Sequence, residues 1–152
     1  MGQVELINVY IERCDKETEN LLAEEEQAFL EKSITYLKEN KKEFVYIEET
    51  HFNEIGVDAL SLEVDDVFGT YDVMLGLKLP KKQEAGIKAY LNRELQGDEV
   101  KFDLMFDQND GLWNVNFTLN LLADFQEDMT FQEAFSSIYH FLAVLVEEVK
   151  NK

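Results

Sequence analysis

Two histidines, His51 and His140, are the first residues to consider for acid–base chemistry or metal binding. His51 follows Glu48 and Glu49, a grouping that suggests a small metal or acid–base cluster. The alternative is a polar strand end, which we favour because no second histidine lies nearby in the sequence. His140 lies between Tyr139 and Phe141 and is interpreted as a boundary residue of a helix rather than a base.

Cys14 is the single cysteine, so the chain forms no internal disulfide and no cysteine-based zinc site. A cysteine nucleophile needs a neighbouring base or a lowered pKa, and no histidine pairs convincingly with it. We therefore interpret Cys14 as an inert thiol.

The acidic residues raise the question of a hard-cation site. Asp65, Asp66 and Asp72 carry the oxygen ligands that Ca²⁺ or Mg²⁺ prefers, although a turn explains them equally well. The stretch 107–114 fails the calcium-loop spacing, because Gly111 in the sixth place would put Phe106 where the first aspartate ligand belongs. No glycine-rich nucleotide motif is present, and we expect no metal, no cofactor and no enzymatic activity.

Four aromatic residues form the strongest candidate binding element. They alternate with polar residues along one predicted hairpin and are Phe102, Phe106, Trp113 and Phe117. As a functional site they would form a groove for an apolar peptide or small ligand. The alternative, which we favour, is that they form the core beneath the last helix. A groove requires some of these side chains to be exposed, whereas a core does not.

The charge excludes several classes of partner. The 152 residues contain 32 Asp and Glu against 14 Lys and Arg, a formal net charge of −18. Such a chain is repelled by nucleic acids and by anionic membranes, and no apolar run is long enough to span a bilayer. We therefore expect no direct nucleic-acid or membrane binding and a protein partner instead, a basic one where the acids gather on one surface. The beginning of the sequence lacks the pattern of a secretory signal, which predicts a cytoplasmic protein.

One stretch, from Phe102 to Val149, contains nine carboxylates and neither Lys nor Arg. If this stretch forms one surface, it would favour a basic partner. If its acids are spread over the molecule, they serve solubility alone.

The sequence is 45% apolar, which is enough for a folded domain. Hydrophobic periodicity predicts the helices and strands that position these residues. Residues 3–12 fit either a strand or a helix, and we favour a strand. Residues 16–40 predict an amphipathic helix, in which Leu22, Phe29, Leu30, Ile34 and Leu37 recur at steps of three and four. Residues 44–47, 60–64 and 71–79 predict three strands in a meander, with Gly69 in a turn.

The second half carries clearer local signals. A short helix over about 82–95 is expected to stop at Gly97, and residues 102–120 predict a β-hairpin around Asn109-Asp110-Gly111. Thr130 and Glu133 have the spacing of a capping box that begins a last, strongly apolar helix. Strands that follow one another directly predict an α+β fold with a mainly antiparallel sheet. The predicted order from about residue 16 is α-β-β-β-α-β-β-α, in a single domain over 1–152 to which the N-terminal extension can add a strand.

This order, together with the acidic balance and the length, resembles the bacterial type III secretion chaperone-like fold over roughly residues 16–150. The resemblance rests on the helix from Lys82, the Phe102–Asn120 hairpin and the helix from Thr130 to Lys150. It implies a homodimer that holds an unfolded segment of a partner, without catalytic residues. The extension Met1–Asp15 departs from the pattern, which leaves helix packing and dimer mode open.

The sequence thus predicts a non-enzymatic protein-binding domain, chaperone-like or regulatory. The alternative is an acidic inhibitor or nucleic-acid mimic that blocks a basic partner.

Overall fold

The computed structural model describes residues 5–6, 8–95 and 102–151. Its centre is one antiparallel sheet of seven strands in the order β2-β1-β3-β4-β5-β7-β6. The strands are β1 (Tyr10–Asp15), β2 (Leu21–Glu25), β3 (Glu43–Glu48), β4 (Val57–Val64), β5 (Tyr71–Leu77), β6 (Phe102–Asp107) and β7 (Leu112–Thr118). The helices are η1 (Gln27–Glu31), α1 (Tyr36–Glu39), α2 (Thr50–Glu54), η2 (Lys81–Gln83), α3 (Glu84–Glu94), η3 (Leu119–Leu121) and α4 (Phe131–Lys150). The expected α+β class and antiparallel sheet are confirmed.

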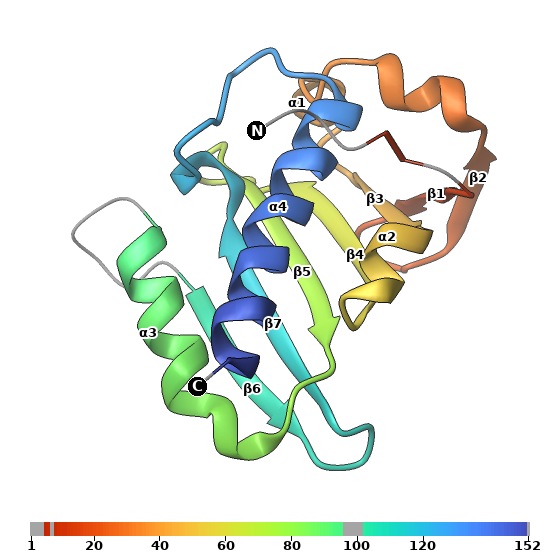
Figure 1. Ribbon diagram of the computed structural model, residues 1–152. Coiled ribbons are helices and arrows are strands. Elements are labelled where there is room, and N and C mark those ends of the chain that lie inside the picture. The colour runs from red at the N-terminus through yellow and green to blue at the C-terminus, as the bar shows by residue number, and fades with distance from the viewer. Residues whose placement is uncertain (1–4, 7, 96–101, 152) are drawn as a thin grey trace.

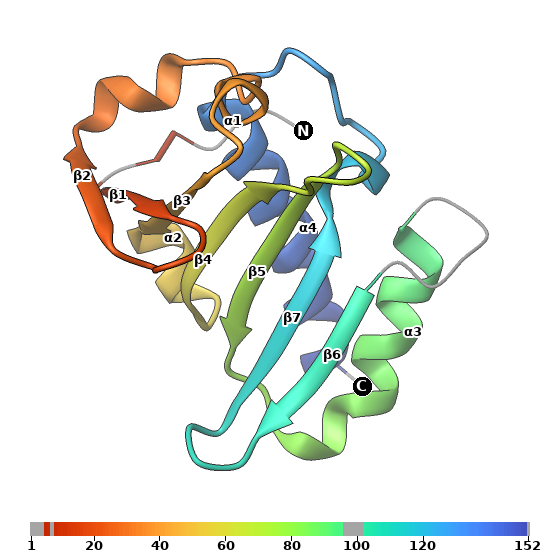
Figure 2. The same cartoon turned by 180° about the vertical axis from the view of Figure 1, so that it is seen from behind.

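The helices cover one face of this sheet. α4 lies across it, and α3 packs beside α4, where the Tyr90 hydroxyl donates to the backbone carbonyl of Phe141 at 2.7 Å (Figure 1). The view from behind shows strands with no helix in front of them (Figure 2). The molecule is therefore a two-layer structure in which the second face of the sheet is open.

The hydrophobic core fills the space between the sheet and α4. Phe135, Leu142 and Leu145 of α4 are fully buried, as are Val73 of β5 and Val115 of β7. The capping box predicted for α4 is confirmed: the Glu133 amide donates to the Thr130 hydroxyl at 3.0 Å, and the Thr130 amide donates to the Glu133 carboxylate at 2.9 Å. Capping and apolar burial together explain why this helix forms.

The strands and hairpin of the second half are also confirmed. β6 and β7 pair in register, with Phe106 opposite Trp113. Gly69 and Gly111 both have φ of 70°, a backbone conformation that glycine adopts without steric cost, and each ends a hairpin turn. The expected stop of α3 at Gly97 lies outside the described residues.

The prediction of one helix over residues 16–40 is wrong. Asp15 begins a tight turn in which Glu19 has φ of 63°, and the chain returns as β2, which pairs with β1. Because of this turn Leu22 is 48% exposed rather than in the core. The remaining periodicity is real, since Phe29 of η1 and Leu37 of α1 are buried, but two short helices produce it.

The predicted element order therefore changes before residue 57. The N-terminal extension does add a strand, β1, which pairs with both β2 and β3. The short helix α2 also lies between β3 and β4, where a direct connection was expected. From β4 onward the order agrees with the prediction apart from the short helices η2 and η3.

Candidate functional site

One face of the sheet is not covered by a helix (Figure 2). Its side chains can be assigned from strand register, because residues paired across neighbouring strands point to the same side of a sheet. One row of paired residues crosses all seven strands: Glu24, Glu12, Tyr46, Ser61, Met74, Asn116 and Asp103. We call the side of the sheet that carries this row the open face.

The open face is acidic. Side chains alternate along a strand, so residues two places from the row also lie on this side. Its carboxylates include Glu12, Glu24, Glu48, Glu63, Asp72 and Asp103. Arg13 is the single basic residue within the seven strands, and it lies on the opposite side with Ile11. The strands thus present carboxylates to solvent on this face without contributing any base to it.

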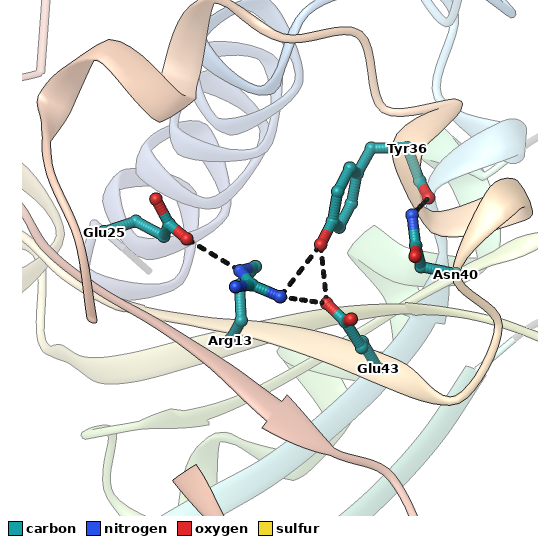
Figure 3. A network of polar contacts seen from close by, with 5 residues as sticks. All are labelled: Arg13, Glu25, Tyr36, Asn40 and Glu43. Atoms are coloured by element: carbon teal, nitrogen blue, oxygen red, sulfur yellow. Dashed lines mark hydrogen bonds and ion pairs between the residues drawn. The ribbon is translucent and has the colours of Figure 1, made fainter. Parts of the chain in front are cut away.

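Arg13 belongs to a polar network beneath α1 (Figure 3). Its Nε atom donates to Glu25 at 2.7 Å, and its Nη1 atom donates to Glu43 at 3.0 Å and to the Tyr36 hydroxyl at 3.0 Å. The Tyr36 hydroxyl in turn donates to Glu43 at 2.7 Å. This network ties β1, β2 and β3 to α1, so Arg13 has a structural role on the helix-covered side and contributes no charge to the open face.

Lys16 is a base that approaches the open face from the turn after β1. Its Nζ atom lies 3.6 Å from Glu63 and 3.2 Å from Asp66. This places one positive charge at the end of β4, near the β4–β5 turn. Glu12, Glu24 and Asp103 lie on other strands of the face.

Asp72 is half-buried near the start of β5, directly opposite Glu63 of β4. Burial raises the pKa of Asp72 to about 6, and the charges of Asp65 and Glu63 add to this rise. Desolvation disfavours the ionised form, and neighbouring carboxylates disfavour it further. At neutral pH the open face therefore carries a carboxylate whose charge a nearby cation would stabilise.

Two tyrosines extend this face toward β1 and β3. The rings of Tyr10 and Tyr46 meet edge to face at 6.5 Å, and their hydroxyls donate to Glu12 and Glu48 respectively. The hydrogen bond to Glu12 raises the pKa of Tyr10 to about 12. Aromatic rings beside carboxylates form a surface suited to Lys or Arg, whose charge meets the acid while the alkyl stem packs on the ring.

Two adjoining shallow hollows mark the other end of the open face. One, of about 410 Å³, is lined by residues that include Glu63 and Asp72. The other, of about 630 Å³, is lined by residues that include Ser61 and Asn114, and Met74 contributes to both. The face therefore combines shallow hollows, the flexible side chain of Met74 and negative charge. This combination suits a peptide or protein segment more than a small enclosed substrate.

The predicted aromatic site lies largely on the other side of the sheet. Trp113 is 2% exposed and Phe117 is 3% exposed, and the Phe117 ring packs 5.2 Å from Phe141 of α4. Phe102 and Phe106 are half-buried and pack against the same core. The four residues are brought together, with Phe117 and Phe102 also contributing atoms to the smaller hollow.

The predicted cluster around His51 consists of one close pair. The His51 Nδ1 atom lies 2.7 Å from Glu49, whose buried carboxylate also accepts backbone amide protons from His51 and Phe52 at the start of α2. Glu48 is not part of the pair and accepts instead from the Tyr46 hydroxyl. Across the described residues, no three His, Cys, Asp or Glu side chains are grouped so that they could hold a metal ion.

The two remaining candidates lie apart from one another. Cys14 is buried, and burial together with Glu12 raises the pKa of its thiol, so it stays protonated. His140 is half-buried on α4, with its ring 5.5 Å from that of Tyr139. Strand alternation puts Cys14 on the side of Glu12, which raises the pKa of its thiol instead of activating it, whereas His140 belongs to α4 on the covered side.

The stretch without Lys or Arg does not form one surface. Asp103 lies on the open face and Asp110 in the β6–β7 turn, whereas Glu133 and Glu147 lie at opposite ends of α4 on the covered side. The acids of the open face come from six different strands instead. The alternation of polar residues along residues 60–64 and 71–79 is the sequence signal for two of them, Glu63 and Asp72.

Comparison of this chain with protein-family models, with curated proteins and with solved structures gives no match. Within the part of the chain that the structure describes, helices long and apolar enough to cross a membrane are absent.

Proposed function

We propose that this protein is a non-enzymatic protein-binding domain, chaperone-like or regulatory, that receives a basic protein segment on the open face. The observation that carries the proposal is the open face itself, with its carboxylates, its two tyrosines and no basic strand residue. Negative potential of this kind accelerates encounter with a positively charged partner and disfavours acidic ones.

The chemistry of the face supports contact with Lys and Arg side chains. Asp72 carries a charge that its surroundings disfavour, so a cation at this position would relieve an existing electrostatic cost. Tyr46 and Met74 offer apolar surface beside the acids, against which the alkyl stem of a lysine or arginine can pack. Affinity would come from these contacts, and the selection of basic partners from the charge.

A matched pair of variants tests the proposal. Glu12→Gln, Glu24→Gln and Asp103→Asn together remove three charges from the open face. Asp110→Asn, Asp128→Asn and Glu147→Gln remove three charges elsewhere. Each protein serves as bait in an extract of its own cell, at low and at high salt. We expect wild-type and control baits to retain the same basic protein at low salt, and the open-face variant to lose it. Equal retention by all three baits would refute the proposal, as would specific binding of a metabolite without any protein partner.

The acidic face also favours a second function, an acidic inhibitor or nucleic-acid mimic that blocks a basic partner. The two functions differ in what happens to the partner. An inhibitor abolishes the activity of the folded partner and competes with a DNA oligonucleotide for it, with affinity that falls steeply as salt rises. A chaperone keeps an unfolded segment of its partner soluble and leaves the folded partner active.

The homodimer implied by the chaperone-like resemblance is part of the first proposal. Sedimentation equilibrium tests it directly. A monomer at all concentrations would contradict the homodimer, and the proposed binding function would then stand without the chaperone-like resemblance.

A further inference from the structure

Three hairpin turns of this protein share one architecture. They run from Asp15 to Glu19, from Asp65 to Gly69 and from Asp107 to Gly111, and the last residue of each has φ between 63° and 70°. In each turn the backbone amide of the fifth residue donates to the carbonyl of the aspartate, at 2.8, 2.9 and 2.8 Å. The aspartate carboxylate also accepts the amide proton of the third residue, at 2.9, 2.8 and 2.9 Å. The turn thus depends on its first and fifth residues.

The middle of the turn is polar in two cases and apolar in the third. Glu17 and Thr18 occupy the third and fourth places of the first turn, and Asn109 and Asp110 those of the last. In the β4–β5 turn these places hold Val67 and Phe68, which are 82% and 80% exposed. Two sister turns with polar residues in the same chain show that the fold does not need this apolar pair.

The pair is held in a defined position. The amides of both Val67 and Phe68 donate to the Asp65 carboxylate at 2.8 Å. Lys16 reaches across from the first turn to Asp66, with its Nζ atom 3.2 Å from the carboxylate. A protruding apolar side chain on a preorganised turn loses little conformational entropy when it is buried in a complex.

We propose that Val67 and Phe68 form an anchor that inserts into an apolar pocket of a partner protein, and that basic side chains edge this pocket. The apolar part of the proposal follows from the exposure of the pair. The basic rim follows from charge complementarity. Three carboxylates flank the tip, those of Glu63, Asp65 and Asp66, and Lys16 is the one base among the described residues that forms ion pairs with them. The same carboxylates oppose insertion into an anionic membrane.

The anchor goes beyond the function proposed above and does not depend on it. The tip projects from one end of β4 and β5, and the β6–β7 turn lies at the opposite end of the sheet (Figure 2). Substitutions at the tip leave Glu12, Glu24 and Asp103 unchanged. Failure of the anchor and failure of the open face are therefore distinguishable.

Photo-crosslinking provides the first test. The full-length chain is produced in its own cell with benzoylphenylalanine in place of Phe68, and separately in place of Asp110 as the sister-turn control. We expect one discrete protein adduct from position 68 and none from position 110. The crosslinked peptide should map to an apolar surface beside Lys or Arg. No adduct from position 68, equal adducts from both positions, or an adduct to lipid or to a second copy of this chain would overturn the proposal.

A second test uses the double substitution Val67→Asn and Phe68→Thr, which takes its residues from the sister turns and leaves the net charge unchanged. We expect the melting temperature to stay at the wild-type value and the affinity for the crosslinked partner to fall about tenfold or more. Unchanged affinity would refute the anchor. A lowered melting temperature would also refute it, because the pair would then serve the fold.

Discussion

Replacing Asp72 by asparagine should stabilise the protein at neutral pH. Burial and the nearby carboxylates raise the pKa of Asp72 to about 6 from a usual 3.8, so the folded state binds a proton more tightly than the unfolded state does. The ionised form therefore costs stability, fully above about pH 6, and the cost disappears below about pH 4. The pKa difference corresponds to at most about 3 kcal/mol, and solvent screening at this half-buried position reduces it to about 1 kcal/mol.

The measurement is urea-induced unfolding of wild type, Asp72→Asn and the control Asp110→Asn between about pH 4 and pH 8. Both substitutions remove one negative charge, so their difference isolates the local environment of Asp72. We expect Asp72→Asn to exceed the control by about 1 kcal/mol at pH 8 and to match it near pH 4. Equal effects at pH 8, or a difference that persists unchanged to pH 4, would refute the account of this carboxylate.

Three substitutions test what holds the open face in place. Thr130→Ala removes the hydroxyl cap of α4 and should cost about 1 kcal/mol of unfolding free energy; a cost near zero would mean that the capping box is energetically idle. Trp113→Ala empties a buried site between sheet and helices and should cost about 3–5 kcal/mol in the same urea assay, whereas a surface side chain would cost far less. Arg13→Met leaves Glu25 and Glu43 without their guanidinium partner and should cost about 2 kcal/mol, of which Glu43→Gln in the same chain should restore a part; a purely additive double variant would show that Arg13 and Glu43 do not interact.

Local signals predicted the second half of the fold correctly. The alternation on either side of Gly111 defines the β6–β7 hairpin, and the spacing of Thr130 and Glu133 defines the start of α4. The hairpin turn and the helix cap are both determined by residues that lie close together in the sequence, so the sequence alone is enough to predict them.

The helix predicted over residues 16–40 failed for a physical reason. Apolar residues at steps of three and four also suit two short helical turns that bury Phe29 and Leu37 separately. What prevents the long helix is the turn at Asp15, where Glu19 takes a positive φ that sequence patterns assign to glycine or asparagine. Because glutamate rarely adopts this conformation, the residue type at position 19 does not predict the turn.

The candidate site was missed because it depends on the arrangement of layers. Polar alternation in β4 and β5 indicates that one side of each strand faces water. It does not indicate that the helices all lie on the other side, nor that acids from six strands share one face. Register across seven strands is a long-range property, and only the structure aligns Glu24 with Asp103 in a single row.

The most direct test of the binding face is an NMR titration of the isotopically labelled protein with a disordered lysine-rich peptide. We expect the backbone amide shifts of Ser61, Met74, Asn116 and Asp103 to change together, and those of α4 to stay constant. The Glu12→Gln, Glu24→Gln, Asp103→Asn variant should weaken this response more than the control with three charges removed elsewhere. Shift changes concentrated on α4, or spread evenly over both sides of the sheet, would contradict the claim that the open face receives the partner.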